Sequence, residues 1–253
     1  MKVVENALLE LCRGLGEDSR KLAILGEGNV SGTVSQTEFL VKASGASLGV
    51  MSASDLTLCN AEAILGLLDR KGISDGEVEA TLLESRVRPG DRRPSVEAAF
   101  HAWLLTLENV SYVGHCHPTA VNQVLCSPRA RDFAERRVFP DEVVCCGAAS
   151  VFVPYTDPGI PLAREIRERT LHFIKQHNYV PRIILLQNHG IISVGATIEA
   201  VLSSILMATK AAEIFVGAAS LGGPNFMAQK DVDRITSRAD EHYRQQQLKL
   251  NAG

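Results

Sequence analysis

Three histidines of this chain have the spacing of a metal site. His115 and His117 are two residues apart, and His189 follows much later in the sequence. The apolar content of residues 110–117 predicts a strand, and residues two apart on a strand project from the same face. His189 comes directly after the apolar run 183–186, which predicts a buried strand that ends beside the pair. Three imidazoles leave a fourth coordination position for water or a substrate oxygen, which is the catalytic arrangement rather than the structural one.

Glu97 offers a carboxylate at the start of a predicted helix. Pro94 and Ser95 precede the segment 97–107, which has a helical pattern. Ser95 is predicted to be the N-cap, which places Glu97 in the first turn with its carboxylate directed out of the helix. Such a carboxylate can act as a metal ligand or as a base. His101 lies on the same helix face four residues later, and we interpret it as a packing residue.

Two short segments, residues 28–31 and 42–45, have the composition of a phosphate cradle. Each combines a glycine, a hydrogen-bonding side chain and a backbone that can expose its amides. Phosphate binds where several donors converge with little steric bulk, and Lys42 adds a positive charge. The same residue types are common in ordinary turns. These two segments therefore support a phosphate site only because the histidines and Ser95 occur in the same chain.

Composition excludes several classes of protein. A net charge of -3 and a pI near 6.2 provide no basic surface for nucleic acid. The N-terminal residues lack the order of a signal peptide, and no apolar run reaches the roughly 18 residues that a membrane span needs. The spacing of the six cysteines does not match a disulfide framework. This favours reduced thiols and a cytoplasmic protein. Cys116 lies between two predicted ligands, but strand alternation directs it to the opposite face.

The order of the predicted elements favours an α/β fold. Helices are predicted at 3–16, 95–108, 161–176 and 197–219 and from 118 onward, and strands at 22–34, 38–43, 110–117, 143–153, 182–187 and 191–194. A strand followed by a helix or turn is predicted within 55–70, whereas the polar stretch 71–93 has no clear pattern. This order favours a mixed or antiparallel sheet. Because no linker is evident, residues 1–253 are predicted to form a single domain that ends in a polar helical tail, 231–249.

The chain resembles the class II aldolase and adducin family. Five segments carry the resemblance in the family's order, from about residue 3 to residue 218, and their number makes it specific. By pattern, the chain is similar to the fuculose-phosphate and rhamnulose-phosphate aldolases and to the ribulose-phosphate 4-epimerase. The five segments are Gly28-Asn29-Val30-Ser31, Lys42-Ala43-Ser44-Gly45, Pro94-Ser95-Val96-Glu97, His115-Cys116-His117-Pro118 and Asn188-His189-Gly190.

This resemblance implies a three-layer α/β/α domain with a central sheet, assembled as a homotetramer with active sites at subunit interfaces. It implies a zinc ion held by His115, His117 and His189, and Mn²⁺, Fe²⁺ or Co²⁺ also suit imidazole ligands. Glu97 becomes the carboxylate that can ligate the metal and then serve as the base. The phosphate cradle implied by the resemblance consists of Asn29, Ser44, Gly45 and Ser95, with Lys42 matching a lysine of the epimerase-like members.

The implied activity is reversible cleavage of a C–C bond in a small ketose phosphate through a zinc-stabilised enediolate, with Glu97 moving the proton. Val96 departs from the fuculose-phosphate aldolase pattern, which has a second serine there, so one phosphate donor is missing. Family members also draw an acid from a neighbouring subunit. Asp141 is the candidate for that acid, with Glu142 as the second choice; the same stretch also reads as a surface turn.

Other activities remain open on the same scaffold. A metal-dependent dehydratase, decarboxylase or 4-epimerase acting on a sugar phosphate or sugar acid would need the same ligands. A non-enzymatic, adducin-like scaffold is disfavoured because the three histidines and Glu97 are all present. In each enzymatic case the expected partner is a small molecule, with neither nucleic acid nor a membrane.

Overall fold

A single mixed sheet organises the chain in the computed structural model, which describes residues 1–247, 249 and 250. Its strands are β1 (Asn29–Thr33), β2 (Glu38–Lys42), β3 (Leu56–Asn60), β4 (Tyr112–Cys116), β5 (Val151–Val153), β6 (Ile183–Leu186) and β7 (Gly190–Gly195). The seven-stranded order is β3-β2-β1-β4-β7-β6-β5. Every neighbouring pair is antiparallel except β5 and β6, which are parallel. This confirms the predicted mixed, largely antiparallel sheet.

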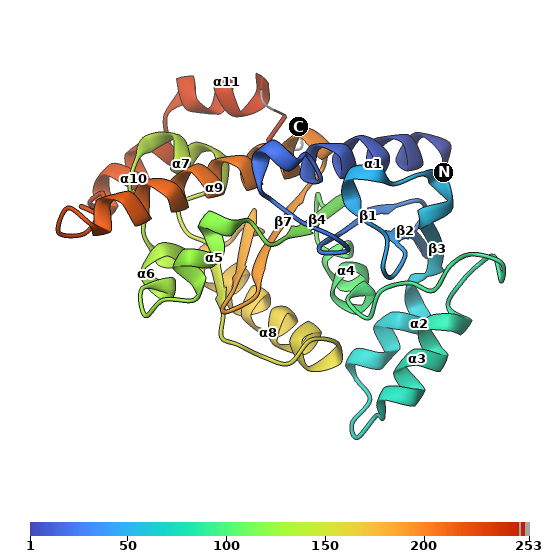
Figure 1. The fold of residues 1–253 in the computed structure, drawn as a ribbon. Coiled ribbons are helices and arrows are strands. Elements are labelled where there is room, and N and C mark those ends of the chain that lie inside the picture. The colour runs from blue at the N-terminus through green and yellow to red at the C-terminus, as the bar shows by residue number, and fades with distance from the viewer. Residues whose placement is uncertain (248, 251–253) are drawn as a thin grey trace.

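Helices cover both faces of the sheet and complete a three-layer α/β/α arrangement (Figure 1). One face packs against α1 (Lys2–Leu15), α5 (Thr119–Leu125), α6 (Ala130–Glu135), α7 (Pro140–Cys146) and α9 (Ile198–Ala219). The other packs against α2 (Ala61–Leu65), α3 (Asp75–Glu84), α4 (Ala98–Leu104) and α8 (Ile160–His177). Leu40 and Val41, adjacent on β2, enter opposite cores because successive strand residues alternate in direction.

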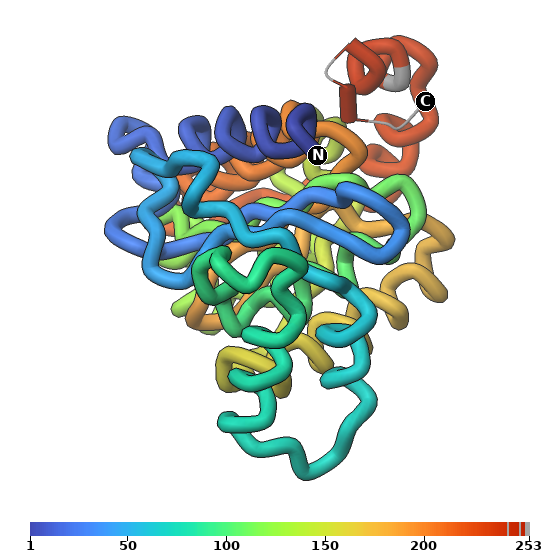
Figure 2. The backbone as a smooth tube through the Cα atoms, turned by 90° about the vertical axis from the view of Figure 1, so that its right-hand side faces the viewer, coloured from blue at the N-terminus to red at the C-terminus, as the bar shows by residue number. Residues whose placement is uncertain are grey.

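The remaining helical elements are two C-terminal helices and several short 3₁₀ turns. α10 (Gln229–Thr236) and α11 (Ala239–Gln247) form the polar C-terminal segment, and short 3₁₀ turns occur at Asp18–Arg20, Leu48–Val50, Ala53–Asp55 and Gly66–Leu68. Figure 2 shows the region around α3, in teal, projecting from the side opposite α1. Within the polar tail predicted at 231–249, residues 231–236 and 239–247 are helical and belong to two helices rather than one, and residue 248 lies outside the described residues.

The long helix α9 is a core helix of the sheet. Its N-cap, Thr197, accepts a hydrogen bond from the amide of Ala200. By length and composition alone it could cross a membrane, with a mean hydropathy of 1.5, but 50% of that window is buried inside the protein. It packs against β7, α1, α5 and α7, which accounts for its apolar composition.

The apolar run predicted as a strand at 143–153 is wrong over its first part. Residues 143–146 are the end of α7, and only residues 151–153 form a strand. Pro140 stands in the first turn of α7 and Asp141 follows it, both of which favour a helix start. All of residues 142–146 are buried, so the sequence has no polar face from which a helical period could be recognised.

Other boundaries also differ from those predicted. The first strand begins at Asn29 rather than at residue 22, and residues 22–28 form a loop. The unassigned stretch 71–93 contains α3, whose start is marked by a capping box between Ser74 and Glu77. That pattern is visible in the sequence and identifies the helix.

A buried ion pair fixes the connection between α6 and α7. Arg137 is 1% exposed and donates to the carbonyl of Gly147 at 2.7 Å and to Ser150 Oγ at 2.8 Å. Its Nη1 lies 3.8 Å from Oε1 of Glu142, while Oε2 of Glu142 accepts from the amide of Val138 at 2.8 Å. Burial raises the pKa of Glu142, and Arg137 opposes that effect.

We expect Arg137→Met to lower the free energy of unfolding by about 3–5 kcal/mol, because it leaves Glu142 buried without its partner. Urea unfolding followed by circular dichroism measures the change. The matched control is Arg70→Met, which removes a pair with Glu77 whose side chains are 51% and 49% exposed, and it should cost less than about 1 kcal/mol. An equal loss of unfolding free energy in the two variants would show that burial does not increase the contribution of the Arg137 pair to stability.

Candidate metal centre and its surroundings

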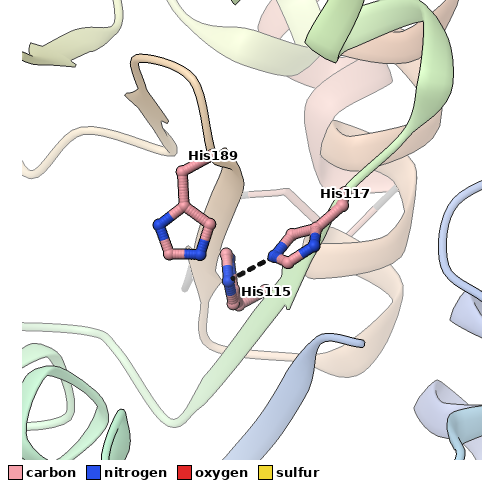
Figure 3. Close-up of side chains that lie close together, drawn as sticks. All are labelled: His115, His117 and His189. Atoms are coloured by element: carbon pink, nitrogen blue, oxygen red, sulfur yellow. Dashed lines mark hydrogen bonds between the residues drawn. The ribbon is translucent and has the colours of Figure 1, made fainter. Parts of the chain in front are cut away.

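The structure brings His115, His117 and His189 together at one end of the central strands. His115 lies near the end of β4, His117 just beyond it, and His189 in the turn between β6 and β7. One ring nitrogen from each lies within 4.8 Å of the others. Figure 3 shows the three rings converging, with Nε2 of His117 at 3.0 Å from Nε2 of His115.

The hairpin of β6 and β7 delivers His189 to this point. Asn188 has a left-handed backbone, with φ of 56°, and Asn122 on α5 donates to the carbonyl of His189 at 3.0 Å. Gly190 lets the strands approach: a Cβ there would lie 2.6 Å from both the carbonyl oxygen of Cys116 and Cδ2 of His117. A side chain at position 190 would therefore force β4 and β7 apart.

Glu97 faces two of the three imidazoles with one carboxylate oxygen. Its Oε1 lies 3.5 Å from Nε2 of His115 and 3.4 Å from Nε2 of His189. Its Oε2 accepts a hydrogen bond from Nδ2 of Asn29. Burial acts to raise the pKa of Glu97, but His115 and His189 outweigh it and hold that pKa well below its usual range. The carboxylate is therefore ionised at neutral pH.

Ser95 was predicted to be the N-cap of the helix, and that detail is wrong. Glu97 is itself the N-cap of α4, and Oγ of Ser95 accepts from the amide of Glu97 at 3.3 Å. Because α4 begins at Ala98, Glu97 lies on the turn before the helix, and the carboxylate reaches the histidines from there.

The electrostatics of the histidines differ with their neighbours. Burial and the rings of His115 and His189 lower the pKa of His117 to about 3, which keeps its imidazole neutral and able to bind a cation. Burial also acts to lower the pKa of His115, but Glu97 raises it above the ordinary value. Nδ1 of His115 contacts the carbonyl oxygen of Ile191 at 2.9 Å, so Nε2 is the nitrogen directed at the centre.

This donor set fits a divalent cation. Two imidazole nitrogens lie 3.0 Å apart with an ionised carboxylate at 3.4–3.5 Å, and such a cluster of electron-pair donors is stabilised by a shared positive charge. Three imidazoles with one carboxylate suit Zn²⁺ and also Mn²⁺, Fe²⁺ or Co²⁺. Cys116 stays outside this set, because it is fully buried in the core on the opposite side of β4.

Two of the predicted phosphate residues, Asn29 and Ser95, are hydrogen-bonded to Glu97. Asn29 donates to Oγ of Ser95 at 3.4 Å, and its Oδ1 has no hydrogen-bond partner among the described residues. The amide of Ser44 donates to the carbonyl of Arg93 at 2.9 Å, which holds the loop at 43–45 beside the segment that leads to Ser95. Ser44 and Gly45 are exposed, and Gly45 has φ of 75° with open space around it.

Lys42 is buried beneath these loops. It is 2% exposed, and its Nζ donates to the carbonyls of Ala46 at 2.6 Å and Gly26 at 3.2 Å. Burial lowers its pKa. The ammonium thus ties together the loops at 22–28 and 43–47, and direct contact between Lys42 and a phosphate stays a prediction.

Asp141 is not brought to the histidines within the chain. It lies in the first turn of α7, and its carboxylate pairs with Arg244 on α11 at 2.7 Å. Its predicted role is in a neighbouring subunit's site, so it stays a prediction. Glu142 is 2% exposed and engaged with Arg137, which makes it the poorer candidate for that role.

Two residues near the centre escaped the sequence analysis. Oε1 of Glu27 lies 3.7 Å from Nδ1 of His117, and Asn122 holds the carbonyl of His189. Glu27 stands two residues before Asn29, so a carboxylate beside a predicted binding loop was the available signal. No local signal marks Asn122, because its partner is 67 residues away.

A cavity of about 1210 Å³ lies elsewhere, among α6, α8 and α10. None of the predicted site residues lines it. The clustered donors therefore lie outside this cavity.

Comparisons with known proteins agree with the geometry. The model of the Class II Aldolase and Adducin N-terminal domain matches residues 6–216. An uncharacterized oxidoreductase of Bacillus subtilis, YuxG, is 26% identical over 210 residues, which cover 80% of this chain and 28% of that protein. The chain thus spans little more than a quarter of that relative's length.

Solved structures share the fold. The N-terminal class II aldolase domain of a conserved protein from Thermoplasma acidophilum has a TM-score of 0.66 and 25% identity, covering 83% of this chain and 92% of that chain. An L-fuculose 1-phosphate aldolase has a TM-score of 0.68 and 16% identity, covering 93% and 95%. With its sheet, its histidine cluster and a family match over most of its length, this chain belongs to the class II aldolase and adducin family.

Proposed function

We propose that this protein is a metal-dependent aldolase that reversibly cleaves a C–C bond of a small ketose phosphate similar to fuculose or rhamnulose phosphate. The observation that carries the proposal is the convergence of His115, His117 and His189 on the carboxylate of Glu97. Burying four polar side chains of the kind that bind metals costs free energy unless they are paired or bind an ion. A domain that serves only as a scaffold gains nothing from such a cluster.

The three histidines would hold the ion, with zinc as the first choice. When bound, a divalent cation supplies a Lewis acid that polarises a carbonyl oxygen and lowers the cost of negative charge beside it. Glu97 is the base, and it takes and returns the proton at Oε1. Asn29 keeps that carboxylate oriented through Oε2. The phosphate would bind to the exposed hydroxyl of Ser44, the amide of Gly45 and the half-buried Ser95, with Asn29 beside them.

Assembly and the acid belong to the same proposal. A homotetramer with its sites at subunit interfaces would bring Asp141 of one chain to the histidines of another, after its pair with Arg244 opens. We also expect a cytoplasmic protein. The Bacillus subtilis relative is named an oxidoreductase, but most of that protein lies outside the match.

The alternatives are a dehydratase, a decarboxylase or a 4-epimerase that uses the same ligands. One observation favours keeping a non-phosphorylated sugar acid among the substrates: Val96, at 38% exposed, takes the place of a hydroxyl donor in the cradle. A carboxylate needs fewer donors than a phosphate.

Metal analysis combined with a product assay tests the proposal. The protein purified without chelator is expected to contain about one zinc per chain, and it should release a three-carbon fragment from fuculose 1-phosphate or rhamnulose 1-phosphate. Ribulose 5-phosphate and the unphosphorylated ketoses serve as comparison substrates. Products of unchanged carbon number, or released CO₂, would replace the aldolase with one of the alternatives, and a folded protein without metal or turnover would favour the scaffold.

A further inference from the structure

The loop at 22–28 lies directly against His117. The amide of His117 donates to the carbonyl of Leu22 at 2.9 Å, so the start of the loop is fixed to the end of β4. Near the end of the loop, Oε1 of Glu27 lies 3.7 Å from Nδ1 of His117. Because this imidazole is neutral and the distance is slightly longer than a hydrogen bond, the contact is a close approach and not an ion pair. This carboxylate has no part in the proposed reaction.

Glu27 is held in that orientation by its own turn. The amide of Ile24 donates to Oε2 of Glu27 at 3.0 Å, and the amide of Glu27 donates to the carbonyl of Ile24 at 3.1 Å. The first bond occupies Oε2 of Glu27 and leaves Oε1 for His117, while the second closes the backbone of the turn. Leu25, at the tip of the turn, has φ of 53°, which is rare for a leucine and persists only where surrounding contacts enforce it.

Lys42 makes a further contact with this turn. Its buried ammonium donates to the carbonyl of Gly26, inside the same turn, and to that of Ala46. The turn is thus anchored from below by a charge that has little access to solvent. Nothing in this arrangement requires a bound phosphate.

The ring orientation of His117 explains what such a carboxylate does. Nε2 of His117 is directed at His115, at 3.0 Å, so Nδ1 is the nitrogen that faces away from the centre. Metal-binding histidines generally donate the outer N–H to a carboxylate or a carbonyl, which fixes the tautomer and strengthens the ligand. For His115 that acceptor is the carbonyl of Ile191, at 2.9 Å.

We propose that Glu27 becomes the corresponding acceptor for His117 when a metal binds, because Oε1 needs to move only from 3.7 Å to hydrogen-bond distance of Nδ1. Glu27 would then be a positioning residue that keeps Nε2 directed at the metal. Lys42 supports this role of Glu27 indirectly, because its hydrogen bond to the carbonyl of Gly26 holds the turn at 24–27. This inference rests on the proposed function only in requiring a metal at the three histidines, and it is independent of the reaction catalysed there.

Metal affinity of the intact protein is the direct test. We expect Glu27→Ala to weaken Zn²⁺ binding about 10- to 100-fold, measured by competition with a chromophoric chelator. The visible spectrum of the Co²⁺-loaded protein should also change, because the geometry at His117 is no longer fixed. Glu27→Gln retains one oxygen for two donors, Ile24 and His117, and should give an intermediate loss; it also serves if the alanine variant fails to fold.

The matched control is Glu17→Ala, which removes a nearby loop carboxylate that pairs with Arg20. It should leave Zn²⁺ affinity and the Co²⁺ spectrum unchanged. Affinity within about threefold of wild type in both Glu27 variants, with an unaltered spectrum, would overturn the inference while leaving the proposed function intact. A wild-type protein that binds no metal would overturn both, and a metal-binding protein with another activity would overturn only the aldolase.

Discussion

Replacing His117 with alanine is expected to reduce the bound metal from about one ion per chain to nearly none and to abolish turnover. The loss of affinity should exceed the roughly 10- to 100-fold that removal of an outer-shell partner causes, because a direct ligand is lost. His117 suits this test because its side chain is 21% exposed, so its removal leaves the core intact. Metal content after gel filtration, together with the rate of product formation, measures the effect.

His172→Ala is the control for this prediction. His172 is exposed on α8 and is absent from the cluster of candidate ligands, so its removal should alter neither metal content nor rate. Full metal content in the His117 variant would remove that residue from the ligand set and, with it, the basis of the proposed function.

Glu97→Gln is expected to lower kcat by about 10²- to 10⁴-fold, the usual contribution of a general acid–base group. The amide keeps the size of the side chain and an oxygen for Asn29, but it cannot take up a proton. Metal content should fall little, because the three histidines remain. Exchange of the product's carbon-bound proton with deuterium in solvent, followed by NMR, isolates the step for which Glu97 is proposed.

Glu79→Gln provides the comparison, since that carboxylate lies on the exposed face of α3 in a pair with Arg93. Its kcat should equal that of wild type. If Glu97→Gln retained kcat within about threefold and still exchanged deuterium, another group would have to be the base.

The sheet and most helices were predictable because their patterns are strong. The segment 161–176 has a charged amphipathic period, and it forms α8. The run at 183–186 is apolar at every position, and the structure buries all of β6. The segment 143–146 has equally apolar residues but is helical. The periodicity of apolar residues cannot distinguish a short helix from a strand when all side chains of the segment are buried.

The candidate metal ligands could be recognised in the sequence because histidine is a common metal ligand and because His115 and His117 are only two residues apart. The contacts that support them could not. Glu27 and His117 are separated by 90 positions and meet only because β1 and β4 pair with Asn29 opposite His115. Lys42 likewise read as a phosphate ligand from its motif, whereas its hydrogen bonds to Gly26 and Ala46 depend on how the loops fold back.

The close packing around Gly190 limits which positions of this protein can be changed to alter its substrate. Any larger residue there would displace the β6–β7 hairpin from Cys116 and His117 and separate the imidazoles. The hairpin therefore tolerates no larger side chain at this position, whatever reaction the scaffold hosts. A directed-evolution library for new specificity would keep residues 187–190 fixed, and also the loop at 22–28 that is bonded to His117, and would vary exposed positions such as Val96.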